Sequence, residues 1–249
     1  WRKVLKKIEG ASDAGYEMRG QVAPRPIGIL LGLTTTLSPF TTRPSFTEVA
    51  GLGLAERIAS LRDPGRKARV LAEPTGHGFQ RLFRLMDEGR KIWLMTDPPN
   101  YEPDPEDSLH AQATARGIDP WSYIYDMLLQ NGGKALLYTP FANYAENNLD
   151  CCRDMILHKD TVMGLGDGGA HVGTICDASF ITSLLTHWGR DRSRGEGIDL
   201  PTLIKCQARD TARAVDLIDR GTLEPGMRAD LNIIDFDNLN VRLPEMIND

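Results

Sequence analysis

The stretch Val162-Met-Gly-Leu-Gly-Asp-Gly-Gly-Ala-His171 decides the expected fold, because an apolar strand here leads into four glycines, an aspartate and a histidine. Glycines let backbone and ligand approach each other closely. In a parallel α/β protein the reactive residues gather after the carboxyl ends of strands. Asp167 is therefore a candidate general base, metal ligand or both, or it only caps the helix that follows. His171 either contacts a ligand or makes a loop hydrogen bond.

Short apolar strands alternate with helical patterns on both sides of this stretch. The alternation indicates parallel βα units. Strands are predicted within 20–33, where two prolines interrupt the run, at 135–138 and at 161–165. Helices are predicted at 1–13, 120–130, up to about 158, 178–188, 201–208 with Asp199 as the N-cap, and 211–217.

Two further segments depart from this rhythm. Residues 34–108 hold more than half of the chain's prolines, and we interpret them as an insertion or lid, with short β-like runs at 68–71 and 92–95. Turn residues at 223–230 precede an apolar run at 231–236, which we expect to be a strand that begins a small β module.

Composition excludes several classes of protein. The 249 residues carry 29 basic and 34 acidic side chains, a net charge of −5, so nucleic acid and anionic membrane surfaces are not expected partners. The longest apolar stretch, at 26–33, is too short to span a bilayer. Four cysteines without a Cys-x-x-Cys pair favour a reducing compartment. We therefore expect a soluble, cytoplasmic protein.

Three motifs carry a resemblance to a known family. They are Gly166-Asp-Gly-Gly-Ala-His171, Asp210-Thr-Ala-Arg-Ala214, and the segment from Asp219 through Leu223-Glu-Pro-Gly to Asp235. Together they resemble the C-terminal half of the N-acyl-D-amino-acid deacylases, which belong to the amidohydrolase superfamily. The last motif is shared by many amidohydrolases.

The resemblance implies an α/β fold: part of a metal-dependent-hydrolase (β/α)8 (TIM) barrel at 1–218, with the insertion at 34–108, followed by a β-sandwich segment at 219–249. It implies a hydrolase of carbon–nitrogen bonds other than peptide bonds, with one or two divalent metal ions, zinc in the first instance. Asp167 would bind metal and carry a proton from water to the leaving amine. The expected partner is a small N-acyl amino acid.

Three residues are candidates for contact with that substrate. Arg25 follows a strand and could hold a substrate carboxylate with its planar guanidinium, or it could satisfy loop carbonyls as a structural residue. Tyr144 follows the strand before Asp167 and would line the pocket. His171 would assist Asp167.

The histidines set a limit on this expectation. A catalytic zinc needs several protein ligands, but the five histidines include no His-x-His pair. We therefore expect the remaining ligands upstream of Trp1, which would make the chain a fragment. Two alternatives stay open: a cyclic amidase of the dihydropyrimidinase-like type, and a non-catalytic relative of the barrel enzymes.

Overall fold

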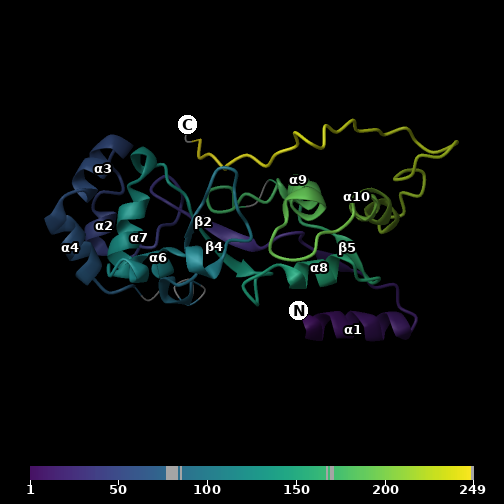
Figure 1. Ribbon diagram of the computed structural model, residues 1–249, viewed down its shortest axis with the longest axis horizontal. Coiled ribbons are helices and arrows are strands. Elements are labelled where there is room, and N and C mark those ends of the chain that lie inside the picture. Colours follow the sequence, from purple (N-terminus) through teal and green to yellow (C-terminus); the bar gives the residue numbers. More distant parts are fainter. Residues whose placement is uncertain (77–83, 85, 167, 169–170, 248–249) are drawn as a thin grey trace. The chain divides into compact units, whose positions relative to one another are not determined.

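The computed structural model describes residues 1–76, 84, 86–166, 168 and 171–247 (Figure 1). The chain forms two compact units. The first unit consists of Trp1–Ile27, Asn143–Gly169 and Asp177–Arg242, and the second of Gly28–Ala142, Ala170–Cys176 and Leu243–Asp249. The predicted insertion at 34–108 falls in the second unit together with flanking residues, and the division at residue 218 stays a prediction.

The first unit contains a pair of parallel strands with helices. Strand β1 (Gly20–Val22) pairs in parallel with β5 (Thr161–Met163), and Val22 lies opposite Met163. The helices of this unit are α1 (Arg2–Asp13), α8 (Asp150–Ile156), α9 (Phe180–Thr186), α10 (Leu200–Ile204) and α11 (Thr211–Arg213). Two wider π-helical turns, η5 (His187–Asp191) and η6 (Lys205–Asp210), continue α9 and α10.

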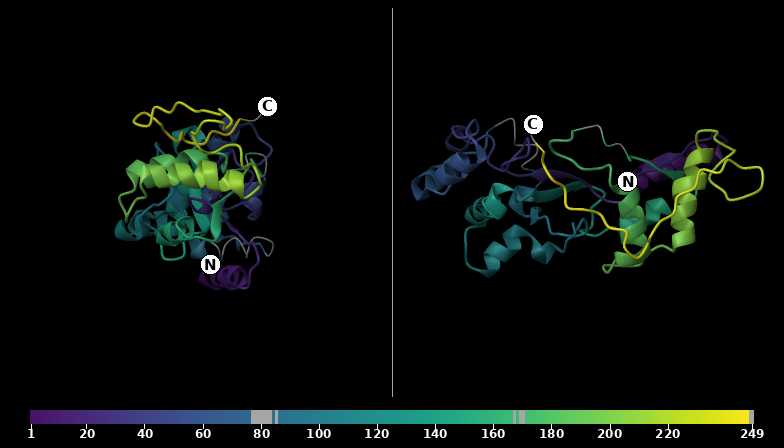
Figure 2. Two further views of the ribbon diagram at one scale, coloured as in Figure 1. Left: turned by 90° about the vertical axis from the view of Figure 1, so that its right-hand side faces the viewer. Right: turned by 90° about the horizontal axis from the view of Figure 1, so that it is seen from above.

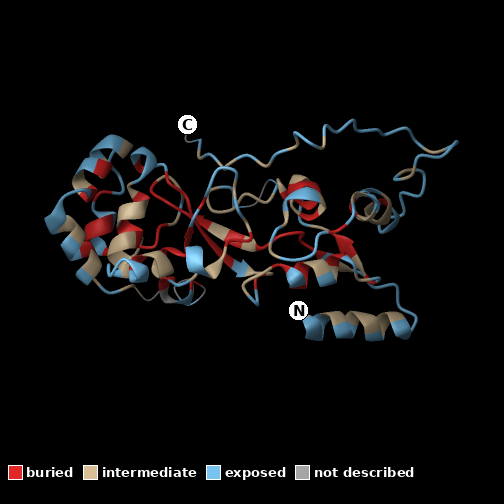
Figure 3. Ribbon diagram, viewed as in Figure 1, coloured by how far each residue is buried: buried red, intermediate tan, exposed pale blue. Residues whose placement is uncertain are grey.

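Local chemistry explains where these helices start. The Asp199 carboxylate accepts the Thr202 backbone N–H at 3.0 Å, and Pro201 lies in the first turn, so the predicted N-cap is confirmed. The predicted helix at 1–13 is also confirmed as α1, although none of its residues is buried (Figure 3). Its apolar residues therefore add little to the core of this unit.

The second unit combines a small sheet with short helices. Its sheet has the strand order β2 (Ile27–Leu31), β4 (Leu137–Ala142) and β3 (Trp93–Leu94), and β3 runs antiparallel to β4. Among its described residues, the α-helices are α2 (Pro44–Thr47), α3 (Leu54–Leu61), α4 (Pro64–Ala72), α6 (Leu109–Ala115) and α7 (Pro120–Leu128). The 3₁₀ turns are η2 (Asp87–Gly89), η3 (Pro105–Asp107) and η4 (Asn131–Gly133).

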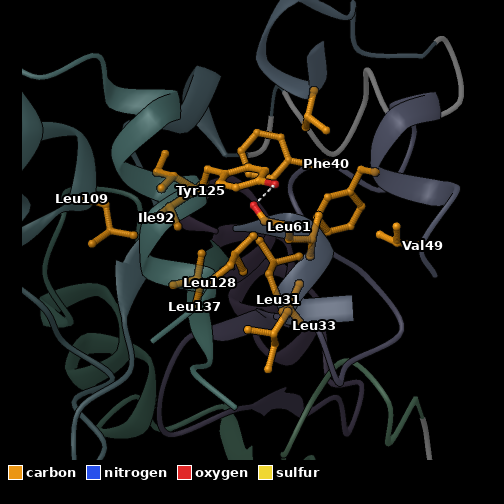
Figure 4. Packing of buried hydrophobic residues seen from close by; sticks show 14 of the residues in the cluster. Leu31, Leu33, Phe40, Val49, Leu61, Ile92, Leu109, Tyr125, Leu128 and Leu137 are labelled. Atoms are coloured by element: carbon orange, nitrogen blue, oxygen red, sulfur yellow. Dashed lines mark hydrogen bonds between the residues drawn. The ribbon is translucent and has the colours of Figure 1, made fainter. Parts of the chain in front are cut away.

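The main hydrophobic core lies in the second unit (Figure 4). Phe40 is fully buried, and its ring centroid lies 5.4 Å from that of Tyr125 and 5.9 Å from that of Trp121. The Tyr125 hydroxyl donates a hydrogen bond to the Leu61 carbonyl oxygen at 2.8 Å. Aromatic packing with a satisfied hydroxyl stabilises this unit independently of the parallel strand pair.

Two sequence expectations are wrong. Residues 68–71 belong to helix α4, because Asp63 caps the Arg66 N–H at 2.6 Å and Pro64 occupies the first turn. Residues 231–236 form no strand: they lie in an extended chain that finds no partner strand among the described residues (Figure 2). Ile233 there is fully exposed. The predicted start of a β-sandwich is thus not formed by this segment.

The predicted barrel is present only as a mixed α/β arrangement. The described residues form one two-stranded parallel sheet and one three-stranded sheet, and neither closes into a barrel. Within the same residues, no helix has both the length and the apolar character that a bilayer crossing requires.

Candidate functional site

The carboxyl ends of β1 and β5 lie side by side in the first unit. The ladder continues one step beyond β5, where the Gly164 N–H donates to the Val22 carbonyl oxygen at 3.0 Å. Both strands end at this edge of the sheet. After β1 the chain reaches Pro24 and Arg25, and after β5 it turns at Leu165, whose φ is 63°. The loops that follow two parallel strands therefore start together, at the edge where α/β proteins place their sites.

A cavity of about 100 Å³ opens beside these strand ends, and we call it the strand-end pocket. It is lined by Pro24, Met163, Gly164, Gly166, Phe180 and Ile181. Gln207 of η6 completes the lining. None of these side chains carries a charge, so the pocket suits an uncharged group.

Missing side chains create part of this space. A Cβ atom on Gly166 would lie 3.4 Å from Cδ1 of Ile181, and one on Gly164 would lie 3.0 Å from Cβ of Gln21. A side chain at Gly166 would therefore narrow the pocket against α9. The glycines that the sequence places after β5 keep this space open.

Two buried contacts fix the loop after β1. Arg25 is 2% exposed; its Nη1 donates to the Ser183 hydroxyl at 2.7 Å, and its guanidinium carbon lies 4.6 Å from the centroid of the Phe180 ring. The indole N–H of Trp188 donates to the Pro24 carbonyl oxygen at 2.6 Å. Both contacts join this loop to α9 and η5. One wall of the pocket is therefore held in place before any ligand arrives.

Asp177 is a half-buried acidic residue of the first unit that interacts electrostatically with Arg25. Burial raises the pKa of the Asp177 carboxyl above its ordinary value, and the positive charge of Arg25 opposes this effect. Sequence reasoning missed Asp177, Ser183 and Gln207. Ser183 and Gln207 are polar residues in the predicted helices at 178–188 and 201–208, but that signal is too common to single out either residue.

The structure brings together only part of the predicted site. Arg25 lies behind the strand-end pocket, whereas Tyr144 lies outside the pocket lining. Tyr144 is 4% exposed, and its hydroxyl accepts a hydrogen bond from Nη1 of Arg194 at 3.3 Å. His171 belongs to the second unit and is exposed. Its carbonyl oxygen accepts the Thr174 N–H at 2.8 Å, and its φ is 52°.

Asp167 lies outside the described residues. The roles predicted for Asp167 as general base and metal ligand therefore stay predictions.

The described residues do not fit a metal centre by themselves. Among them, no three His, Cys, Asp or Glu side chains lie close enough together to hold a metal ion. A catalytic zinc requires about three protein ligands.

The run of arginines at 190–194 is engaged by acidic and carbonyl groups. Arg190 pairs with Asp191 at 2.6 Å. The side chain of Arg192 is fully buried and pairs with Asp150 at 2.6 Å.

The first unit is thus an α/β assembly with a pocket at the carboxyl ends of parallel strands, an arrangement typical of α/β enzymes. The model of the amidohydrolase family matches residues 3–249, and the chain therefore belongs to the amidohydrolase family. Members of this family are typically metal-dependent hydrolases of carbon–nitrogen bonds. No curated protein and no solved structure matches the chain.

Proposed function

We propose that this amidohydrolase removes the acyl group from an N-acyl-D-amino acid, a linear amide. Membership of the family supports hydrolysis of a carbon–nitrogen bond. One structural observation carries the proposal further: the residue before Asp167, Gly166, lines a pocket at the paired carboxyl ends of β1 and β5. A substrate group in this pocket would lie next to the segment that contains Asp167.

The proton transfers of the reaction fall to Asp167. Water adds to the carbonyl carbon of the amide, and the Asp167 carboxylate accepts the proton that the water loses. The carbon–nitrogen bond then breaks, and Asp167 returns this proton to the nitrogen. The products are a carboxylic acid and an amine, and transfer of the acid's proton to the amine gives a carboxylate and an ammonium ion, so atoms and charges balance.

We propose zinc as the metal, with Asp167 as one of its ligands. A bound divalent ion would polarise the amide carbonyl and would lower the pKa of water toward neutrality. Because the described residues do not form a ligand set, the steps assigned to this chain remain those of its own carboxylate.

Arg25, Tyr144 and His171 are proposed to contact the substrate. Nη1 of Arg25 donates to the Ser183 hydroxyl. Arg25 would bind the substrate carboxylate with its other guanidinium nitrogens. The Tyr144 hydroxyl would have to exchange Arg194 for the substrate. His171, whose side chain is exposed, is also proposed to contact the substrate.

The substitution Asp167→Asn in the complete protein tests the proposal. It preserves shape but removes the basic carboxylate, so kcat should fall about 10²- to 10⁴-fold. The metal content, measured by inductively coupled plasma mass spectrometry, should stay unchanged. Asp154→Asn is the matched control, because Asp154 is exposed on α8.

The substrate panel separates the proposed class from its neighbours. N-acetyl-D-leucine should be hydrolysed faster than its L enantiomer, and dihydrouracil should not be opened. Opening of dihydrouracil without hydrolysis of the linear amides would identify a cyclic amidase instead. Unchanged turnover of Asp167→Asn would reject the role of Asp167.

A further inference from the structure

We infer that the strand-end pocket is a specificity pocket that binds a short branched aliphatic group of the substrate, with Gln207 hydrogen-bonding the polar group attached to it. The inference rests on the proposed function, because it deepens the description of the same site. Its experimental test nevertheless measures binding separately from hydrolysis.

The size of the pocket selects the kind of group. Its volume is about 100 Å³, whereas whole ligand pockets measure roughly 300–1,000 Å³. An engineered apolar cavity of about 150 Å³ holds a benzene molecule. The strand-end pocket is smaller than that cavity, so it encloses a branched group of three or four carbons more fully than a six-membered ring.

The lining selects for apolar character. Met163 and Phe180 are 7% and 1% exposed, and Ile181 lies at the mouth with 45% of its surface exposed. Burying a charge against such side chains is costly without a paired group. An aliphatic group instead gains the contact area that Met163, Phe180 and Ile181 offer.

The walls are ordered without a ligand. Trp188 holds Pro24 through its indole N–H, and Arg25 holds Ser183 behind Phe180. A preformed pocket discriminates by shape, because neither wall can move away without breaking a buried hydrogen bond.

Gln207 provides the polar contact. It lies on the π-helical turn η6, a type of turn that is frequent at functional sites. Within the described residues, no hydrogen bond engages the Gln207 carboxamide, although its backbone carbonyl oxygen accepts the Thr211 hydroxyl at 2.5 Å. The carboxamide can therefore donate to a ligand carbonyl oxygen or accept from a ligand N–H.

The direct test uses isobutyramide as the probe, because it joins a branched aliphatic group to an amide. The complete protein, labelled with ¹³C in its isoleucine and methionine methyl groups, is titrated and followed by NMR. The methyl signals of Ile181 and Met163 should shift in a saturable way. Cyclohexanecarboxamide should leave them in place at the same concentrations.

The variant Gly166→Ala fills the pocket toward Ile181. It should weaken isobutyramide binding about tenfold or more, the scale of one methyl group in a tight site. Gly51→Ala is the matched control, because a Cβ there would meet no atom within 4 Å. The control should bind isobutyramide as the wild type does.

Two further variants keep the test informative if Gly166→Ala does not fold. Ile181→Ala, at a half-exposed position, should admit cyclohexanecarboxamide and reverse the preference between the two amides. Gln207→Leu should weaken isobutyramide binding several-fold, because one hydrogen bond is lost. Equal affinities in all three variants would overturn the inference.

Kinetic series then distinguish which part of the substrate enters the pocket. In the complete protein, acyl groups are varied from acetyl to isobutyryl on one amino acid, and amino acids from alanine to leucine with one acyl group. In one of the two series, the ranking of substrates by kcat/KM should differ between Ile181→Ala and the wild type. The substrate part varied in that series, acyl group or amino-acid side chain, is the part that enters the pocket. Saturable binding of isobutyramide without hydrolysis of any N-acyl amino acid would reject the proposed function but support the specificity pocket. Hydrolysis of N-acyl amino acids without binding of isobutyramide would support the proposed function but reject the specificity pocket.

Discussion

The indole N–H of Trp188 and the carbonyl oxygen of Pro24 form a buried hydrogen bond of 2.6 Å across 164 positions of the sequence. Trp188 is 1% exposed, and the guanidinium carbon of Arg192 lies 4.7 Å from the centroid of its ring. Because Pro24 lines the strand-end pocket, this single contact fixes a pocket wall to the helix that follows β5.

The substitution Trp188→Phe should destabilise the first unit and loosen the pocket. It leaves the Pro24 carbonyl oxygen buried without its donor, which costs about 1–3 kcal/mol in unfolding free energy. Urea denaturation, followed by circular dichroism, measures this loss. Isobutyramide should also bind more weakly. An unchanged denaturation midpoint would show that the carbonyl finds another donor.

Ser183→Ala and Arg25→Lys separate packing from substrate binding. Ser183→Ala removes one acceptor of Arg25 and should lower the unfolding free energy by about 1–3 kcal/mol, with a smaller effect on KM than Arg25→Lys. Arg25→Lys removes the planar fork and should also raise KM for an N-acyl amino acid about tenfold. The corresponding amino acid amide, which lacks the carboxylate, is the control substrate. A KM that stays constant in Arg25→Lys would restrict Arg25 to packing.

Tyr125→Phe should change how stability depends on pH. Burial raises the pKa of the Tyr125 hydroxyl from 10.0 to about 12. The neutral hydroxyl therefore contributes stability that is present below pH 10 and is lost as the pH rises toward 12. The variant should be less stable by about 1–3 kcal/mol near pH 8, because the Leu61 carbonyl loses its donor. It should also lack this alkaline loss. Tyr16→Phe, at a 69% exposed position, is the control.

Cys151 gives a second dependence on pH, of the opposite sign. A hydrogen bond from Cys152 lowers the pKa of the Cys151 thiol from 9.0 to about 7. The thiolate therefore contributes stability that is full above pH 9 and is lost as the pH falls through 7. Denaturation midpoints should rise between pH 7 and 9 in the wild type and rise less in Cys151→Ser. Cys176→Ser should behave as the wild type, and an identical slope in Cys151→Ser would contradict this assignment.

Local signals in the sequence were sufficient for much of the first unit. Asp199 predicted the start of α10, and the apolar runs around Val22 and Met163 predicted strands that indeed pair in parallel. These features depend on residues that are close in sequence or on a periodicity that one strand carries by itself. The same reasoning placed Asp167 after a strand, at a position outside the described residues.

Other features depend on distant partners and could not be read from the sequence. Arg25 and Ser183 are 158 positions apart, and nothing local to either residue predicts their hydrogen bond. The run at 231–236 has the composition of a strand, but a strand exists only with a neighbour, and the described residues offer none. Residues 68–71 were assigned from β-branched and apolar character, which the cap at Asp63 overrides.

Trp188 shares the turn η5 with Arg190, whose guanidinium binds the backbone carbonyl oxygens of Phe236, Asp237 and Leu239. One short turn thus anchors both the pocket wall and an extended stretch of chain far along the sequence. If a ligand in the pocket stabilises the ordered turn, it must also stabilise the anchored stretch. Anchoring of that stretch must in turn strengthen ligand binding by the same factor. A ligand bound in the pocket should therefore slow amide hydrogen exchange at residues 236–239.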